Sequence, residues 1–396
     1  MATSDNSSKL IKLNQLTTDK FFRAEVSKPK HNSELTLLTQ HYKCVTPPTS
    51  TIVVNVKDLG AKGNGIANDT VAIQSAIDQV TGTGGIVHIP NGIYMIDAVV
   101  HLLLKSNMTI SMDENTVLKA IPNNQKNYGI IRIEHAENAN IVGGTVEGER
   151  NQHEGSGGEW GMGIEIYDSK NVVIEQLVSK DNWGDGFYVG NNSVHSLFCS
   201  VTADNNRRQG MSITSADSVR IMDSIFKNTH GTAPMDGLDL EPNEGETINN
   251  VQILNSHFLN NQGCGIELSV PDNIAKTGAI ISSVTIDSNH IINNGEVGAY
   301  SAGIKVSRAS MLKVTNNIVN DNLQDGIIIV NESSNNLISG NQVTKNGNPT
   351  DTKNGYGILL YQANQNTVAN NFVNANRKKN IFDSDSKGSL IENNTP

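Results

Sequence analysis

The stretch Met235-Asp236-Gly237-Leu238-Asp239-Leu240-Glu241-Pro242 contains one copy of a short pattern that recurs along the chain. Each copy is a glycine, an apolar residue, a variable residue and, in most copies, a second apolar residue. The glycines that open the copies are Gly129, Gly163, Gly186, Gly210, Gly237, Gly265, Gly303, Gly326 and Gly357. Their shortest separations are 23 and 24 residues, and the longer ones fit the same unit with an insertion. A period of this length indicates a solenoid of stacked coils.

The composition limits the class of protein. The chain has 396 residues, of which 37% are hydrophobic and 18% charged, and this is compatible with one long β-rich domain and a smaller appendage. The net charge of −10 argues against nucleic acid as a partner. We expect no membrane-spanning segment, because no run of about 18 apolar residues occurs. We see no signal peptide at the polar amino terminus, although action outside a cell or on a virion is expected.

Two regions are expected. Residues 1–50 are polar, rich in Lys and Thr, and lack the glycine-led pattern, which suggests an arm or adaptor. Residues 51–396 form the repeat domain. Near its start, Asp69 and Thr70 are expected to cap a helix with one apolar face, and this helix would cover the core of the first coil. The residues of that face are Ile73, Ala76, Ile77 and Val80.

Two further sequence features concern the coils. Asn and Asp tolerate left-handed turn geometry, so a column of them is expected at one corner of every coil. The three cysteines, Cys44, Cys199 and Cys264, lack metal-ligand spacing, and we expect buried or free thiols rather than a disulfide. The corner column consists of Asp181, Asp204, Asn228, Asn261, Asn294, Asp321, Asn346 and Asn376.

Five segments near the start of the repeat domain carry a family resemblance: residues 55–65, 68–70, 72–77, 84–85 and 89–94. Together they resemble the opening of the pectate-lyase superfamily domain. That group includes rhamnogalacturonase-like and polygalacturonase-like enzymes, alginate C5-epimerases and phage tailspikes. The resemblance implies an all-β, right-handed parallel β-helix with a carbohydrate substrate, but it does not choose a reaction.

The variable residue of each copy is expected to point outward, because side chains alternate along a strand. Successive variable residues would lie about 4.8 Å apart. Asp239 and Glu267, with the nearby Asp236 and Glu241, would form a carboxylate cluster on an exposed face. Like charges this close repel one another, and a substrate, a proton or a cation is needed to compensate the repulsion. The outward column is Glu165, Tyr188, Ser212, Asp239, Glu267, Lys305, Ile328 and Leu359.

Loops of variable length are expected to wall this face into a groove. The two tryptophans occupy equivalent places in neighbouring coils and would contact sugar rings. Two adjacent arginines would hold a carboxylate or sulfate of the glycan, and His153 and His230 are candidate proton carriers. The expected substrate contacts are Trp160, Glu165, Trp183, Asp185, Tyr188, Arg207, Arg208, His230 and Arg308.

The favoured reaction is hydrolysis of a polysaccharide, without a cofactor or metal. Asp236 with Asp239, or Asp239 with Glu267, would act as acid and base, and Lys305 would orient the sugar with Arg308. Direct neighbours approach the spacing of about 5 Å in retaining enzymes, whereas diagonal pairs approach about 6.5–9.5 Å in inverting ones. The catalytic candidates are Asp236, Asp239, Glu241, Glu267 and Lys305.

Two alternatives remain open. In a lyase or uronate C5-epimerase, the carboxylates would hold Ca²⁺ and Lys305 would remove the C5 proton. A glycan-binding or tailspike protein would bind the polymer without cleaving it. Residues 182–186 and 303–305 resemble motifs of polygalacturonase-like hydrolases, but residues 207–210 lack their Asp pair. A homotrimer would cover the edge of the last coil.

Overall fold

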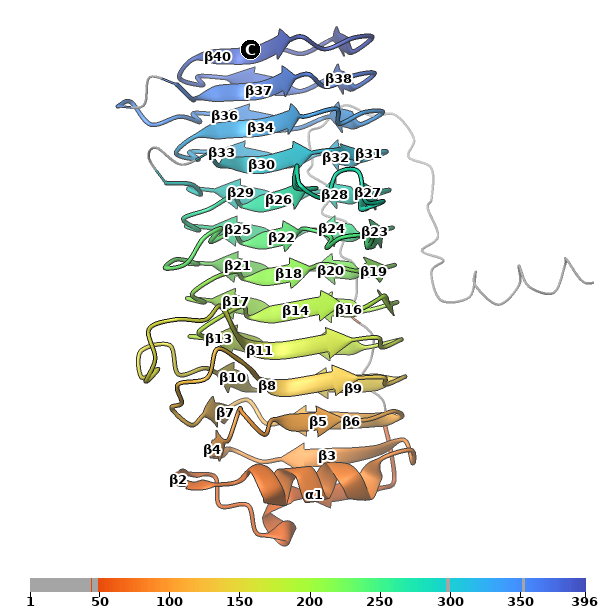
Figure 1. Ribbon diagram of the computed structural model, residues 1–396, viewed down its shortest axis with the longest axis vertical. Coiled ribbons are helices and arrows are strands. Elements are labelled where there is room, and N and C mark those ends of the chain that lie inside the picture. Colours follow the sequence, from red (N-terminus) through yellow and green to blue (C-terminus); the bar gives the residue numbers. More distant parts are fainter. Residues whose placement is uncertain (1–43, 45–48, 297–299, 351–352) are drawn as a thin grey trace, which may run out of the picture. The chain divides into compact units, whose positions relative to one another are not determined.

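The computed structural model describes residues 44, 49–296, 300–350 and 353–396. The unit formed by residues 42–396 is a stack of similar coils (Figure 1). Three long sheets run along the stack, some of the coils add a strand to a fourth, five-stranded sheet, and strands of neighbouring coils pair in parallel. The predicted all-β solenoid is therefore confirmed as a parallel β-helix.

An 11-stranded sheet carries the glycine-led pattern. Its strands, from the amino-terminal end, are β5 (Leu102–Leu104), β8 (Asn127–Glu134), β11 (Trp160–Tyr167), β14 (Phe187–Gly190), β18 (Met211–Ile213), β22 (Leu238–Leu240), β26 (Ile266–Ser269), β30 (Ala302–Ser307), β34 (Asp325–Val330), β37 (Tyr356–Tyr361) and β40 (Lys379–Ser384). The two apolar residues of the copy in β22, Leu238 and Leu240, are buried, as the alternation requires.

Three further sheets complete the coils. The 13-stranded sheet contains β1 (Val53–Asn55), β3 (Gly85–Ile89), β6 (Met108–Met112), β9 (Ala139–Val142), β12 (Val173–Glu175), β16 (Leu197–Cys199), β20 (Arg220–Met222), β24 (Gln252–Leu254), β28 (Thr285–Asp287), β32 (Lys313–Thr315), β35 (Leu337–Ser339), β38 (Thr367–Ala369) and β41 (Leu390–Glu392). The 12-stranded sheet contains β2 (Asn64–Asn68), β4 (Gly92–Ile96), β7 (Thr116–Ala120), β10 (Thr145–Glu147), β13 (Val178–Lys180), β17 (Thr202–Asp204), β21 (Ile225–Lys227), β25 (His257–Leu259), β29 (His290–Ile292), β33 (Ile318–Asn320), β36 (Gln342–Thr344) and β39 (Phe372–Asn374). The five-stranded sheet contains β15 (Ser193–Val194), β19 (Ala216–Asp217), β23 (Thr247–Asn249), β27 (Ile280–Ser282) and β31 (Ala309–Ser310).

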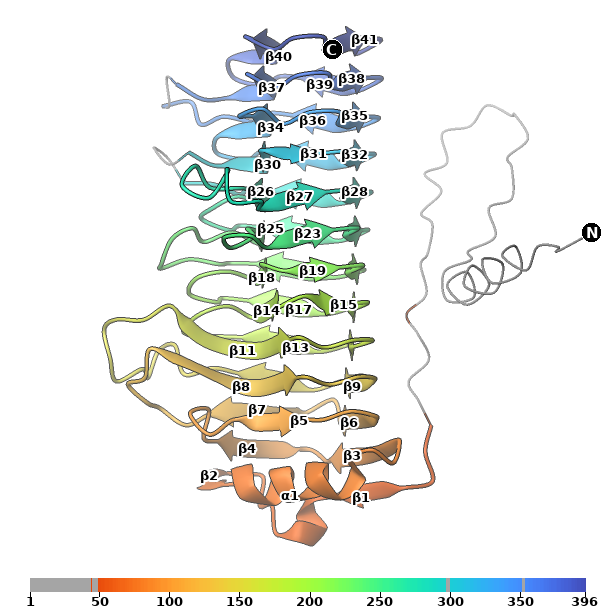
Figure 2. The same ribbon diagram turned by 45° about the vertical axis from the view of Figure 1, so that its right-hand side comes forward.

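Helix α1 (Thr70–Val80) covers the amino-terminal end of the stack, next to the short 3₁₀ helix η1 (Val56–Leu59) (Figure 2). The predicted apolar face of α1 is buried, so the predicted cap is confirmed. Asp69 is at the N-cap, but its carboxylate makes no capping bond. It accepts instead from the backbone N–H groups of Lys62 and Gly63, at 2.6 and 3.0 Å. Asp69 thus holds the glycine-rich turn rather than the helix.

The corner column requires a correction, because it mixes three adjacent positions. Asp181, Asn228 and Asp321 have the expected left-handed backbone, whereas Asp204 directly precedes the left-handed Asn205. Asn261 and its equivalents follow the left-handed residue and point inward, where each amide bonds to the amide one coil away, as in the Asn261 Nδ2 to Asn294 Oδ1 bond of 2.9 Å. This buried ladder consists of Asn182, Asn206, Asn261, Asn294, Asn322, Asn346 and Asn376, with Thr229 between the second and third.

The expectation about cysteines was wrong in one respect. Cys44 and Cys199 form a disulfide, whereas Cys264 is a buried free thiol. Because the two cysteines are 155 residues apart in the sequence, the sequence did not indicate that they meet on the outer face of β16. The predicted arm, residues 1–50, lies mostly outside the described residues. Among the described residues, no helix is both long and apolar enough to cross a membrane.

Candidate active site

The outward column is confirmed by the strand register of the 11-stranded sheet. On the successive strands β18, β22, β26 and β30, the register places Ser212 opposite Asp239, Asp239 opposite Glu267, and Glu267 opposite Lys305. The column extends toward β8, where Arg132 pairs with Glu165. The fold therefore brings the predicted catalytic side chains onto neighbouring strands.

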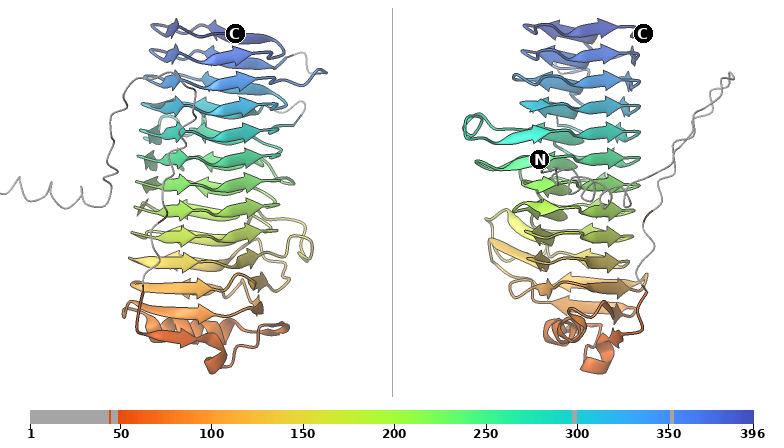
Figure 3. Two further views of the ribbon diagram at one scale, coloured as in Figure 1. Left: turned by 180° about the vertical axis from the view of Figure 1, so that it is seen from behind. Right: turned by 90° about the vertical axis from the view of Figure 1, so that its right-hand side faces the viewer.

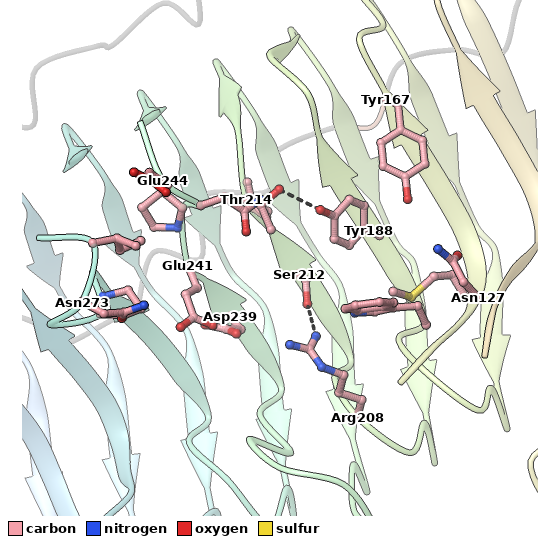
Figure 4. Close-up of a pocket in the computed structure, with 17 residues that line it drawn as sticks. Asn127, Tyr167, Tyr188, Arg208, Ser212, Thr214, Asp239, Glu241, Glu244 and Asn273 are labelled. Atoms are coloured by element: carbon pink, nitrogen blue, oxygen red, sulfur yellow. Dashed lines mark hydrogen bonds between the residues drawn. The ribbon is translucent and has the colours of Figure 1, made fainter. Parts of the chain in front are cut away.

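A groove of about 520 Å³ lies over β11 to β22. The loop before β11 and the loop after β26 project from the same side of the stack (Figure 3). Figure 4 shows Asp239, Glu241, Arg208 and Tyr188 facing this groove. The remaining lining residues include Asn127, Trp160, Tyr167, Ser212, Thr214, Pro242, Asn243, Glu244, Pro271, Asn273 and Ile274.

Asp239 lies in the groove wall but is nearly inaccessible, with 3% of its surface exposed. Gln209 Nε2 donates a hydrogen bond of 2.8 Å to Asp239 Oδ2. Burial raises the pKa of Asp239 well above its usual value, and the negative charges of Glu267 and Glu241 raise it further. Asp239 is therefore placed to hold a proton.

Asp236 is also buried, with 1% exposed, so the expectation of an exposed cluster was wrong for both aspartates. Gly263 packs directly against its carboxylate, and no side chain larger than glycine would fit there. The backbone N–H of Cys264 donates to Asp236 Oδ1. Burial raises the pKa of Asp236 well above its usual value, with Glu267 and Asp239 adding to the effect. Asp236 stands beside the groove rather than in its lining.

Glu267 forms an ion pair with Lys305, with Oε1 2.7 Å from Nζ. Burial alone would lower the pKa of Lys305, but the attraction of Glu267 and the nearby Cys264 outweighs burial, and the pKa is raised. Burial, followed by the charge of Glu267, raises the pKa of Glu241. The positive charge of Lys305 compensates the negative charge of the Glu267 carboxylate. Glu267 therefore lies beside a cation, whereas Asp239 lies beside other acids.

Arg208 connects the middle of the column to the groove. Its Nη1 lies 3.2 Å from Asp185 Oδ2, and the same oxygen accepts from the Ser212 hydroxyl at 2.7 Å. Burial raises the pKa of Asp185, although Arg208 and Ser212 oppose this. The Arg208 Nε atom is 3.6 Å from Glu159, which precedes β11. Arg208 lines the groove, whereas Asp185 is buried beneath it.

Glu165 and Tyr188 continue the column toward the amino terminus. Glu165 is fully buried and pairs with Arg132 at 2.9 Å, and burial raises its pKa. Tyr188 lines the groove, and its hydroxyl lies 2.9 Å from that of Thr214. Tyr188 can therefore contact a bound molecule directly, whereas Glu165 is inaccessible to one.

The two tryptophans differ in their surroundings. Trp160 is 50% exposed and lines the groove. The Trp183 ring instead stacks on the His153 ring, with centroids 4.0 Å apart, and the Arg207 guanidinium lies 3.8 Å from its centroid. Arg207 also donates to the Gly158 carbonyl at 2.8 Å. Trp183, His153 and Arg207 thus hold the loop before β11, and Trp160 is the free aromatic surface.

The remaining candidates lie apart from the groove. The His153 side chain is buried, and its Nδ1 lies 2.9 Å from Glu149. His230 is exposed, with Nδ1 2.8 Å from the Asn228 carbonyl. Arg308 pairs with Asp272 and lines a separate hollow on the other side of the loop after β26. Neither histidine lines the groove.

Among the site residues that were not predicted, Cys264 and Tyr167 had a signal in the sequence. Cys264 directly precedes Gly265, the position that Asp185, Gln209 and Asp236 occupy in earlier copies. Tyr167 follows Glu165 by two, as Glu241 follows Asp239. Both positions follow from the repeat, but the residue types, a cysteine and a tyrosine, did not indicate a site.

A family model described as rhamnogalacturonase A/epimerase, pectate lyase-like, matches residues 53–278, more than half of the chain. The chain belongs to this family. A second model, the right handed beta helix region, matches residues 249–395. The predicted superfamily and the handedness of the helix are thereby confirmed.

The relatives include proteins with and without an assigned reaction. The chain is 27% identical to the uncharacterized protein YclG of Bacillus subtilis over 393 residues, covering 81% of this chain and 67% of YclG. It is 30% identical to alginate lyase 7 of Azotobacter vinelandii over 202 residues, covering 41% of this chain and 23% of that protein. Among solved structures, the A-module of A. vinelandii mannuronan C-5 epimerase AlgE6 superposes with a TM-score of 0.67 at 19% identity, covering 85% of this chain and 99% of that one. At this identity the structural match supports the fold alone.

Proposed function

We propose that this β-helix protein hydrolyses glycosidic bonds of a polysaccharide, with Asp239 as the general acid and Glu267 as the base. The observation that carries the proposal is their opposite environment on directly paired strands. Burial and neighbouring acids raise the pKa of Asp239, whereas Lys305 pairs with the Glu267 carboxylate. Two neighbouring carboxyls in such different environments suit the acid and base of this reaction.

The surroundings of the pair support a polymer substrate. The groove is open and runs along the sheet, so a chain could lie across several coils. Trp160 offers a flat apolar surface for a sugar ring at one side. Arg208 lines the groove between Trp160 and Asp239 and could bind an acidic or hydroxyl group of a sugar. Trp183 and Arg207 would support this surface through the loop that they hold.

A second candidate is β-elimination or C5-epimerisation of a uronate. The identity to alginate lyase 7 favours it. In that reaction Lys305 would neutralise the substrate carboxylate rather than remove the C5 proton, because its pKa is raised. Ca²⁺ held by the acidic cluster remains part of this candidate.

The test is to incubate the protein with neutral and uronate-containing polysaccharides, with EDTA or with added Ca²⁺. New reducing ends and the ultraviolet absorbance of unsaturated uronates are followed together. Reducing ends without absorbance, unaffected by EDTA, support hydrolysis. Absorbance that EDTA abolishes contradicts the proposed acid and base, and supports elimination. Proton exchange at C5 without cleavage supports epimerisation, and binding without any of these changes supports a glycan-binding protein.

A further inference from the structure

Cys264 has no part in the proposed reaction, yet its thiol lies among the acidic side chains. Its Sγ contacts Glu267 Oε2 at 3.5 Å, and its backbone N–H donates to Asp236. One possible ligand atom from each of Asp236, Cys264 and Glu267 lies within 4.8 Å of the other two. A thiol and two carboxyls therefore converge on one point beside the groove.

The Asp236 carboxyl gives an independent reason to expect a ligand at this point. The side chain is almost completely buried, and among the described residues its Oδ2 atom has no hydrogen-bond partner. A buried polar atom without a partner costs about 1–3 kcal/mol. A group that bound Asp236 Oδ2 would remove this cost.

The local balance of charge favours a cation as that group. Asp236, Asp239, Glu267 and Cys264 can each lose a proton, whereas two basic side chains act on them: Lys305 pairs with Glu267, and the charge of Arg208 acts on Asp239. Lys305 contacts Oε1 of Glu267, so Oε2 still faces the sulfur. Such a surplus of acids holds protons or exchanges them for a metal ion.

We propose that Asp236, Cys264 and Glu267 bind a divalent ion of the zinc class, such as Zn²⁺, Co²⁺ or Cd²⁺. One sulfur and two carboxylate oxygens suit these ions, which take about four ligands at about 2.0–2.3 Å. Ca²⁺ fits less well, because it takes six to eight oxygens. On binding, the thiol and any protonated carboxyl release their protons to solvent, and water supplies the remaining ligand.

The bound ion would inhibit the enzyme, because a Glu267 carboxylate that coordinates the ion cannot act in the reaction. Only this consequence depends on the proposed function. The ion binding itself depends only on the three side chains, so the two claims can be tested separately.

The experiment titrates the full chain with Co²⁺ and records the near-ultraviolet charge-transfer band of a thiolate bound to cobalt. We expect one ion per chain, loss of the band in Cys264→Ser, and at least tenfold weaker binding in Asp236→Asn. Glu241→Gln is the matched control, since Glu241 is in the same acidic cluster but outside the three ligands, and it should retain the band. Cys44 and Cys199 are joined in a disulfide and supply no thiolate. Circular dichroism verifies the fold, and Cys264→Ala replaces the serine variant if that variant misfolds.

A folded wild-type protein without the band, or a band unchanged in Cys264→Ser, overturns the site. A band lost with Cys264 supports it even if no polysaccharide is cleaved, so failure of the proposed function is recognised separately. Where cleavage is found, Zn²⁺ should lower kcat/KM at least tenfold in the wild type and much less in Cys264→Ser. Equal inhibition of both proteins overturns the inhibitory role.

Discussion

At the scale of single residues, Asp239 has the environment of a proton donor. Replacing it by asparagine keeps its size and removes the proton, so kcat/KM for polymer cleavage should fall by about 10²–10⁴-fold. The rate of formation of reducing ends measures this loss. Asp383→Asn is the control, because Asp383 is an exposed carboxylate on β40 of the same sheet. A folded Asp239→Asn protein with more than a tenth of the wild-type activity would contradict the assignment.

Glu241 should determine part of the pH dependence. Its negative charge helps to raise the pKa of Asp239, after burial and Glu267. Glu241→Gln removes that charge, so the pKa of Asp239 falls and its proton is lost at lower pH. The alkaline limb of the kcat/KM profile should therefore move to lower pH. Glu244→Gln, in an exposed residue of the groove rim, should leave the limb in place.

The sequence predicted that Asp239 and Glu267 are neighbours, but not how deeply the site residues lie or that His230 and Arg308 lie apart from the groove. The alternation along β22 and β26 placed Asp239 beside Glu267, because the same repeat determines where each strand lies and which residues of neighbouring strands face each other. Burial of Asp236 depends on Gly263 and the loop around it, which come from the next coil. The difference between Trp160 and Trp183 depends on His153, a loop residue with no fixed position in the repeat.

At the scale of structural elements, the asparagine ladder should be a major source of stability. Asn294 donates to the Phe258 carbonyl at 2.9 Å and to Asn322 at 3.0 Å, and accepts from Asn261. Asn294→Ala would leave these buried partners unsatisfied, and the free energy of unfolding should fall by about 2–4 kcal/mol. Urea unfolding measures it.

The neighbouring Asn293 provides the control for the ladder. It is exposed and has a left-handed backbone, with φ of 57°. Asn293→Gly should therefore change stability by less than about 1 kcal/mol, since glycine accepts this conformation. A similar loss in both variants would contradict the distinction. The sequence could not separate the two positions, because asparagine suits both a left-handed turn and a buried amide ladder.

At the scale of the whole molecule, the disulfide should stabilise the fold. It joins residues 155 positions apart, and the constraint on so long an unfolded segment contributes about 2–5 kcal/mol. Reductant should lower the urea midpoint of the wild type, and Cys44→Ser should already have the lower midpoint and respond no further. Cys264→Ala should respond to reductant as the wild type does. A wild type insensitive to reductant would contradict this role.

The family and the coil architecture could be predicted because they repeat, whereas the disulfide could not. Cys44 lies before the first coil, where no period defines its place relative to Cys199. Disulfides persist in oxidising surroundings. The disulfide therefore supports the expectation that this protein acts outside the reducing cytosol.

The repeated contact between coils also has a mechanical consequence. Each coil is held to the next by similar parallel strands and, along much of the stack, by one amide of the ladder. Helix α1 covers the amino-terminal end. A force applied along the axis would load these interfaces in series, so we expect coils to detach one after another rather than all at once. The protein would then lengthen in steps under tension.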